Sequence, residues 1–301
     1  MTSVLVTGAA GTLGQSLVRR LVDAGVEVVG LDLREPSGRP ARGPFVPAPF
    51  GGPFDATVRS VIAGTTHLVH LAAQMGVATA PPGDRWRALA APVDELHALV
   101  AALPALRHVV FASSYMVYAP PPPDPVTEDA ELGPINAYAW SKCAVEAYLE
   151  CSALPSCRLR FAGVYGPGVP VHQGRAVTEV IRALAQDREV RLYRPGTNLR
   201  NHLYVDDAVE ALRRAVTESW QGTYNVAGPV AVSLRDIVGM AGEAAGRPAR
   251  IRWDDGEPGW DAVLDTDRLI RRYGFQAYTA PEDGLRAYYE WAKVHAVGVD
   301  R

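Results

Sequence analysis

Near its N-terminus the chain reads Val4-Leu-Val-Thr-Gly8-Ala-Ala-Gly11-Thr-Leu-Gly14, an apolar run that leads into regularly spaced glycines. Residues 16–22 then place apolar side chains at helical intervals. A strand, a glycine turn and a helix in this order bring backbone close to a pyrophosphate at the helix N-terminus. The stretch therefore predicts a dinucleotide-binding turn, with contacts from Gly8, Gly11, Thr12, Leu13 and Gly14. An ordinary tight turn is the alternative interpretation.

An acidic residue ends the second apolar run, Val28-Val-Gly-Leu-Asp32. It follows the turn by about twenty residues, where a carboxylate can accept hydrogen bonds from both hydroxyls of an adenosine ribose. The same carboxylate would repel a 2′-phosphate, so the sequence favours NAD(H) over NADP(H). Arg34 weakens this preference, because its guanidinium could bind a phosphate instead.

Further apolar runs alternate with helical patterns. Strands are expected at 4–7, 26–32, 67–72, 108–113 and 158–162. This alternation predicts an α/β fold with a Rossmann-type, doubly wound parallel sheet and right-handed crossovers. The proline-rich stretch 44–53 is expected to be an irregular connection.

Lys142 is one of only two lysines in a chain that otherwise uses arginine for its cations. It stands four residues after Tyr138, so in a helix over 137–151 both side chains would share one face. A cation beside a phenol favours phenolate and lowers a pKa that is otherwise about 10. The pair therefore predicts a tyrosine that works as an acid and base near neutral pH.

The same spacing recurs at Tyr289 and Lys293, so the bare pattern is weak. The second copy lies in an amphipathic pattern over 285–293, where we expect the aromatic side chains to face a core and the lysine to be solvated. For the first copy, the alternative interpretation is that Tyr138 and Lys142 are surface residues of a helix.

Several segments together match the motifs of a known family. They are Phe111-Ala-Ser-Ser114-Tyr-Met-Val-Tyr118, Asn136-Ala-Tyr138-Ala-Trp-Ser-Lys142, His202-Leu-Tyr-Val-Asp-Asp207 and Gly222-Thr-Tyr-Asn-Val226. With the glycine turn, they make the chain resemble the extended short-chain dehydrogenase/reductases, and within them the NAD-dependent epimerase/dehydratase family. The resemblance covers nearly the whole length.

The resemblance implies roles for the catalytic residues. Ser114, rather than its neighbour Ser113, is the family's catalytic hydroxyl and hydrogen-bonds the substrate oxygen. Tyr138 moves a proton on or off that oxygen while a hydride passes between the nicotinamide and the same carbon. Lys142 binds the nicotinamide ribose and biases Tyr138 toward phenolate.

The resemblance also implies where cofactor and substrate are held. Leu71, Ala72 and Ala73 line the dinucleotide, while Tyr115 and Arg200 contact a substrate that is expected to be anionic. Residues 1–166, rejoined by 200–227, are expected to form the NAD-binding domain. Residues 167–199 and 228–301 are expected to form a smaller substrate-binding region.

Three departures from the family pattern narrow the reaction. Gly163 stands where nucleotide-sugar epimerases commonly carry an asparagine that contacts the substrate. A family arginine would fall near Asp255, in the acidic run Trp253-Asp-Asp-Gly-Glu257, which would repel a diphosphate. Tyr115 and Met116 replace the Asp-Glu pair of 4,6-dehydratases, so dehydration is disfavoured.

The leading expectation is transient oxidation of a secondary alcohol, with epimerisation of a nucleotide sugar as the outcome. A net dehydrogenase or ketoreductase on a polar substrate is the nearest alternative, because it would use the same catalytic residues. An NAD-sensing protein without turnover is the remote one.

Composition excludes other classes of protein. A net charge of −3 without a basic stripe argues against nucleic-acid binding. No apolar run is long enough to cross a membrane, so a cytoplasmic location is expected. Cys143, Cys151 and Cys157 lack metal-ligand spacing, and we expect reduced thiols and no metal. A homodimer is expected through the helix that carries Tyr148 and Leu149.

Overall fold

The computed structural model describes residues 2–34, 44–73, 85–122, 124–169, 176–193, 195–255 and 259–295. The chain forms two compact units. The first unit comprises Met1–Ala119, Glu131–Arg160 and Val209–Tyr224, and the second comprises Pro120–Ala130, Phe161–Ala208 and Asn225–Arg301. The polypeptide therefore passes back and forth between the units, and neither is one continuous stretch.

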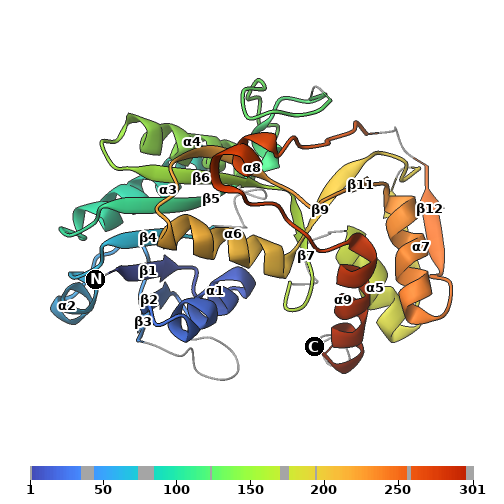
Figure 1. Cartoon of the computed structure of the whole chain (residues 1–301), viewed down its shortest axis with the longest axis horizontal. Helices are drawn as coiled ribbons and strands as arrows, with labels where there is room; N and C mark the ends of the chain where they lie inside the picture. Colours follow the sequence, from blue (N-terminus) through green and yellow to red (C-terminus); the bar gives the residue numbers. More distant parts are fainter. Residues whose placement is uncertain are drawn as a thin grey trace. The chain divides into compact units, whose positions relative to one another are not determined.

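A seven-stranded sheet has the order β10-β6-β5-β4-β1-β2-β3 (Figure 1). Its strands are β1 (Ser3–Thr7), β2 (Glu27–Asp32), β3 (Phe45–Pro47), β4 (His67–His70), β5 (His108–Ser114), β6 (Ser156–Phe161) and β10 (Gly222–Val226). The pairs β1–β2, β1–β4, β2–β3 and β4–β5 are parallel. The chain winds outward from β1 in both directions, which confirms the predicted doubly wound α/β fold.

The prediction of an irregular connection at 44–53 is wrong for its first part, because Phe45–Pro47 forms the edge strand β3. This strand bonds β2 through alternate residues: Gly30 donates to the Pro44 carbonyl and Ala48 donates to the Asp32 carbonyl. Pro47 lies between these bonding positions, so the donor that it lacks is not needed by the ladder. Proline is tolerated on an edge strand for this reason.

Helices cover the sheet of the first unit. They are α1 (Thr12–Asp23), α2 (Ala56–Ile62), α3 (Arg85–Ala101), α4 (Ala137–Cys151) and most of α6 (Val205–Thr217). Side chains of α2, α3 and α4 share a core with alternate residues of β1, β2, β4 and β5. Leu149 is 1% exposed within this core, so it is not available to a partner as the sequence suggested. Arg20 and Glu210 place α1 and α6 side by side through an ion pair of 3.6 Å.

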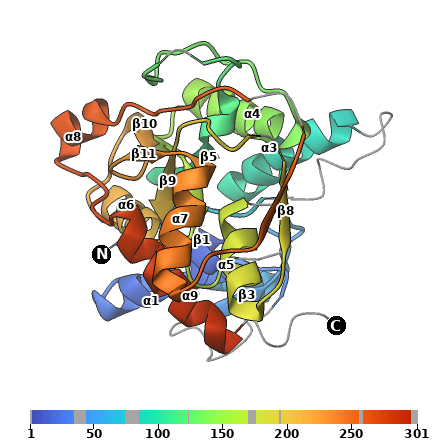
Figure 2. The ribbon, with the colours of Figure 1, turned by 90° about the vertical axis from the view of Figure 1, so that its right-hand side faces the viewer.

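The second unit has two small sheets and its own helical core. The sheets are β11-β9-β7 and β12-β8, built from β7 (Gly163–Tyr165), β8 (Val190–Tyr193), β9 (Arg200–Tyr204), β11 (Ala231–Val232) and β12 (Ile251–Asp254). Helices α5 (Ala176–Gln186), α7 (Leu234–Ala245) and α9 (Pro281–His295) pack against one another (Figure 2), and α8 (Asp267–Tyr273) precedes α9. No helix in the described part of the chain is both long and apolar enough to cross a membrane.

The second Tyr-x-x-x-Lys copy lies on α9 and has a structural role. Tyr289 is 8% exposed and belongs to the core of the second unit. Lys293 reaches solvent and forms an ion pair with Glu290 at 2.6 Å. The expectation of a buried aromatic face and a solvated lysine is confirmed.

Candidate active site

The glycine turn between β1 and α1 requires residues without side chains. Gly8 has a φ of +69°, in the left-handed region, and a Cβ there would lie 2.9 Å from the Ala72 amide nitrogen. A Cβ on Gly14 would lie 2.1 Å from the Gly8 carbonyl oxygen. A side chain at either position would therefore push the turn away from β4 or from α1.

The same turn leaves the start of α1 open to a ligand. Gly11 is the N-cap residue, it is exposed, and its extended backbone caps the helix without a side-chain hydrogen bond. Thr12 and Leu13 follow as the first residues of α1. The positive end of a helix dipole favours an anion, so the turn fits the pyrophosphate of a dinucleotide.

Asp32 lies at the end of β2, next to the turn. Its Oδ2 accepts a hydrogen bond of 3.0 Å from the Ala10 amide, and its Oδ1 accepts one of 2.7 Å from the Leu33 amide. These contacts fix the carboxylate beside the turn while it remains half-exposed. Arg34 is exposed two residues further on. The structure thus brings Asp32 and the glycine turn together.

The residues after β4 lie beside the glycine turn. β4 ends at His70, two residues earlier than expected, because the chain then bonds to the end of β1: Leu71 donates to the Thr7 carbonyl and Ala72 to the Thr7 hydroxyl, both at 3.3 Å. Leu71, Ala72 and Ala73 therefore follow β4 at the point where the sheet order reverses. Dinucleotides bind at this point in such sheets.

The helix that carries Tyr138 and Lys142 spans the predicted residues, Ala137–Cys151. It begins there because the side chain of Asn136 caps it, accepting a hydrogen bond of 2.9 Å from the Ala139 amide. The Lys142 Nζ lies 5.6 Å from the centre of the Tyr138 ring. The two side chains are neighbours on one face of α4, as their spacing predicts.

Lys142 is 5% exposed, and its Nζ donates a hydrogen bond of 2.8 Å to the Ala112 carbonyl. The ammonium also lies 4.7 Å from the centre of the Phe111 ring. Burial lowers the pKa of Lys142 to about 8, against an opposing effect of the Glu146 carboxylate. Lys142 is therefore still mostly charged at neutral pH, and it joins α4 to the end of β5.

The two serines at the end of β5 make different contacts. Ser114 is 7% exposed, caps the short 3₁₀ turn η3 (Tyr115–Val117), and accepts a hydrogen bond of 3.3 Å from the Met116 amide. The Ser113 hydroxyl donates to the Glu146 carboxylate. Adjacent strand residues point to opposite faces of the sheet, so the Ser113 side chain faces Glu146 of α4 and the Ser114 side chain does not. Tyr115 follows in η3 and is half-buried.

A buried charged cluster lies behind these residues, and the sequence did not identify it as functional. Glu146 pairs with Arg160 of β6 at 2.7 Å, and both side chains are 6% exposed. Arg160 also donates to the Tyr118 hydroxyl at 3.1 Å. The spacing of four residues between Lys142 and Glu146 could have revealed half of the cluster, but the pairing with Arg160 depends on the fold.

Arg200 belongs to the second unit. It lies on β9, is half-buried, and donates to the Trp260 carbonyl at 3.3 Å. His202 shares its face of β9, and Gly163 is the partner of His202 on β7.

The negative charge of the acidic run at 253–257 is partly paired with arginine in the structure. Asp254 forms an ion pair of 2.9 Å with Arg191 of β8, and the Arg252 side chain lies 4.0 Å away. Its charge is therefore partly compensated, which weakens the prediction that Asp254 repels a diphosphate. Gly256 and Glu257 lie outside the described residues.

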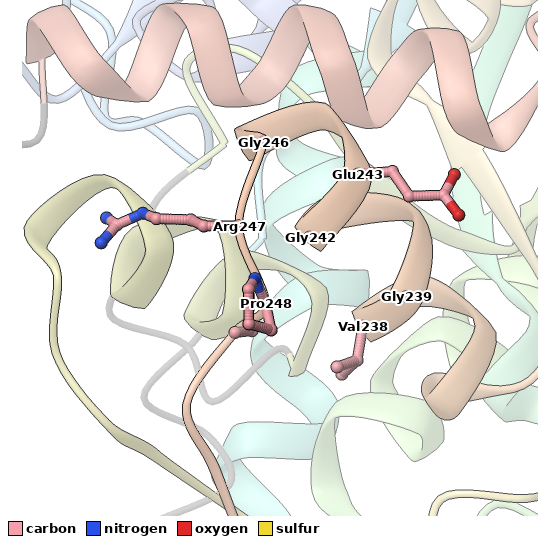
Figure 3. Close-up of a pocket in the computed structure, with 8 residues that line it drawn as sticks. Val238, Gly239, Gly242, Glu243, Gly246, Arg247 and Pro248 are labelled. Atoms are coloured by element: carbon pink, nitrogen blue, oxygen red, sulfur yellow. The ribbon is translucent and has the colours of Figure 1, made fainter.

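A hollow of about 400 Å³ lies beside the C-terminal half of α7, where glycines leave the helix surface bare (Figure 3). Its lining consists of Val238, Gly239, Gly242, Glu243, Gly246, Arg247, Pro248 and Ala249. Arg247 is already bonded to Asp187 and to the Leu184 carbonyl. None of the predicted site residues lines this hollow, so it is separate from the candidate active site.

Comparison with known proteins agrees with this geometry. A sequence model of the NAD dependent epimerase/dehydratase family matches residues 4–227. The UDP-glucose 4-epimerase of Mycolicibacterium smegmatis is 32% identical, with 95% of this chain and 97% of that protein covered. The dTDP-glucose 4,6-dehydratase of Streptomyces griseus is also 32% identical, with coverages of 98% and 95%. The structure of MoeE5 with UDP-glucose and NAD has a TM-score of 0.82, 28% identity, and coverages of 97% and 99%.

Proposed function

Because the chain belongs to the NAD dependent epimerase/dehydratase family, we propose that it is an NAD-dependent 4-epimerase of a nucleotide sugar. The supporting observation is that Ser114, Tyr138 and Lys142 lie on adjoining elements of the first unit, on a chain similar along 95% of its length to a UDP-glucose 4-epimerase. NAD is the cofactor of this family, and the glycine turn fits its pyrophosphate.

In this proposal the residues of the first unit hold the cofactor. Gly11, Thr12 and Leu13, at the start of α1, lie against the pyrophosphate, and Asp32 accepts hydrogen bonds from the hydroxyls of the adenosine ribose. Leu71, Ala72 and Ala73 form the wall opposite α1. When bound, NAD accepts a hydride from the substrate carbon and returns it.

Proton movement is assigned to side chains of this protein. Tyr138 takes the proton of the substrate hydroxyl during oxidation and gives it back during reduction. Ser114 hydrogen-bonds the same oxygen, which helps to hold it while its charge changes. Lys142, fixed by the Ala112 carbonyl, presents a buried cation to Tyr138 and favours its phenolate form.

The substrate is expected to be anionic, and the second unit is expected to bind it. Arg200 is proposed to pair with a phosphate of the nucleotide, since arginine recognises phosphate in a bidentate manner. Partial compensation of Asp254 by Arg191 weakens one objection to a diphosphate there. A homodimer and a cytoplasmic location remain predictions of this proposal; Trp140 on α4 is 51% exposed and could contribute to a contact between subunits.

Dehydration is the second candidate, because a relative of equal identity is a dTDP-glucose 4,6-dehydratase. The two reactions share the first oxidation but differ afterwards, since dehydration requires an acid and a base to eliminate water. Tyr115 and Met116, which follow Ser114, cannot act as a carboxylate pair. This favours epimerisation.

The test is to incubate the purified protein with UDP-glucose, UDP-glucuronic acid or dTDP-glucose and to identify products by NMR. We expect the 4-epimer of one of these sugars and no net formation of NADH. A 4-keto-6-deoxy sugar would instead establish dehydration. NADH formed in proportion to product would establish a net dehydrogenase.

A further inference from the structure

Glu146 is a buried carboxylate that the proposed mechanism does not use. It is 5% exposed, and it lies one helical turn beyond Lys142 on α4. Its Oε1 accepts from the Ser113 hydroxyl and from Arg160 Nε at 3.1 Å, while its Oε2 accepts from Arg160 Nη2 at 2.7 Å. Both carboxylate oxygens are therefore bonded.

Arg160 is itself held in place. The Glu146 side chain therefore cannot adopt another rotamer without breaking several hydrogen bonds. The Arg160 guanidinium stacks 4.9 Å from the centre of the Tyr118 ring and donates to its hydroxyl at 3.1 Å. A forked guanidinium with a bidentate carboxylate is a rigid arrangement. The cluster Ser113, Glu146, Arg160 and Tyr118 thus fixes one negative charge inside the first unit.

Two consecutive residues of β5 bind two residues of α4. The Ala112 carbonyl accepts from Lys142, and the next residue, Ser113, donates to Glu146. These contacts set the position of α4 along β5. They thereby set the position of Tyr138 on α4 relative to Ser114, the last residue of β5.

The charge of Glu146 also reaches Lys142. Among the described residues, the charged or titratable groups that act on this ammonium or lie against it are Tyr138 and Glu146 on α4 and His70 on β4, and Arg160 of β6 is bonded to the far side of Glu146. Burial keeps His70 neutral by lowering its pKa to about 3, so it supplies no charge. Glu146 is the carboxylate that raises the pKa of Lys142, against the larger opposing effect of burial.

We propose that Glu146 is a positioning residue of this active site: its carboxylate, held by Arg160 and Ser113, fixes Lys142 against the end of β5 and supplies a buried negative charge beside the ammonium. The role in turnover rests on the proposed function, whereas the effect on Lys142 does not. The two parts can therefore be tested separately.

Because the chain has only two lysines, Lys142 can be observed directly. Protein labelled with ¹³C at lysine Cε should give two NMR signals, and Lys293→Arg assigns them. In the wild type the Lys142 signal should titrate near pH 8. In Glu146→Gln, which keeps the size and loses the charge, we expect this midpoint to fall by about one unit. The exposed Lys293 serves as an internal reference, and Glu150→Gln is the matched control, because Glu150 is exposed on the same helix.

Turnover gives the second readout. Loss of the Glu146 charge should move the whole pH profile of kcat toward acid, because it makes the ammonium easier to deprotonate and the phenol easier to ionise. A merely structural residue would lower kcat or thermal stability without moving the profile. Glu150→Gln should leave the profile unchanged.

Glu146→Gln leaves Arg160 without its partner and could unfold the first unit. The double variant Glu146→Gln/Arg160→Gln removes both charges and keeps hydrogen-bonding groups, so it is the second test. It should still show an acid shift of the Lys142 midpoint, and a smaller one, because loss of the Arg160 charge acts in the opposite direction. An unchanged Lys142 midpoint in a folded variant would overturn the proposal. If the Lys142 midpoint shifts in the variant but the wild-type protein turns over no nucleotide sugar, only the proposed function would be overturned.

Discussion

Gly163 and His202 are parallel partners on β7 and β9, and the Nδ1 of His202 lies 3.8 Å from the place where a Cβ on Gly163 would stand. Burial, followed by the charge of Arg200, lowers the pKa of His202 to about 4, so its ring is neutral at physiological pH. The second unit therefore places an uncharged donor and acceptor beside a position that has no side chain.

We expect Gly163→Asn to fold normally and to bind a nucleotide sugar more tightly. The added Cβ would make an ordinary van der Waals contact with His202, and one new hydrogen bond contributes about 1 kcal/mol, or roughly fivefold in affinity. Titration calorimetry measures the affinity. His202→Phe is the companion variant, since it keeps the ring and removes both nitrogens. Weaker binding by Gly163→Asn would show that the substrate itself needs the open space.

Tyr138→Phe should abolish turnover and leave folding and NAD binding nearly intact, because an acid–base group contributes about 10²- to 10⁴-fold to the rate. Lys142→Arg keeps the charge but replaces the compact ammonium that the Ala112 carbonyl holds at 2.8 Å. It should lower kcat and move the pH profile toward alkali. Tyr289→Phe, from the second Tyr-x-x-x-Lys copy, is the control and should retain full activity. An active Tyr138→Phe protein would overturn the assignment of Tyr138 as the acid–base group.

Asp32 should set the choice of cofactor. Its half-exposed carboxylate is fixed beside the glycine turn by the Ala10 and Leu33 amides, where it opposes a 2′-phosphate. Fluorescence titration should show NAD(H) binding at least about tenfold tighter than NADP(H), which corresponds to about 1.4 kcal/mol. Equal affinities would remove Asp32 from this role, and Arg34→Ala would then show whether Arg34 binds the phosphate.

Arg200→Ala should weaken the binding of a nucleotide sugar and leave the affinity for NAD unchanged. Loss of a charge-assisted hydrogen bond costs about 1.5 to 3 kcal/mol. Calorimetry with UDP and with NAD separates the two effects, and Arg286→Ala, at an exposed arginine of α9, is a control for lost charge. Unchanged affinity for UDP would indicate a substrate without a diphosphate.

Acid should destabilise the protein through His70. Burial lowers its pKa from 6.5 to about 3 in the folded state, and its ring is bonded to the Thr7 hydroxyl at 2.8 Å. The unfolded chain therefore binds more protons between these two values, so this part of the stability is complete above pH 6.5 and is lost as the pH falls toward 3. The loss amounts to several kcal/mol at most, about 1.4 kcal/mol per unit of pKa shift.

Chemical denaturation at a series of pH values measures this dependence. His70→Asn keeps a group that can bond Thr7 but does not titrate, so its stability should vary less with pH over the same window. His202, whose pKa is also lowered, should remain as a weaker source of acid sensitivity. Equal slopes for the variant and the wild type would show that His70 is not the group responsible.

Local patterns predicted local structure well. The helix considered over 137–151 for the spacing of Tyr138 and Lys142 is α4, and the Asn136 side chain caps its start. Strand β3 was missed, because prolines disfavour strands in general and only its place at the edge of the sheet makes Pro47 acceptable. The pairs Glu146–Arg160 and Arg191–Asp254 were missed as well, since no local pattern shows which distant charge a buried or half-buried carboxylate meets.

The alternation of the two units along the chain limits how this protein can be engineered. Each unit is assembled from three segments, and every segment of one is followed by a segment of the other, except at the C-terminus. A single cut therefore releases neither unit, and no N-terminal or C-terminal fragment consists of one complete unit alone. Grafting the second unit of a relative onto the first unit of this chain would require three simultaneous exchanges, with matched splice points at 119/120, 130/131, 160/161, 208/209 and 224/225.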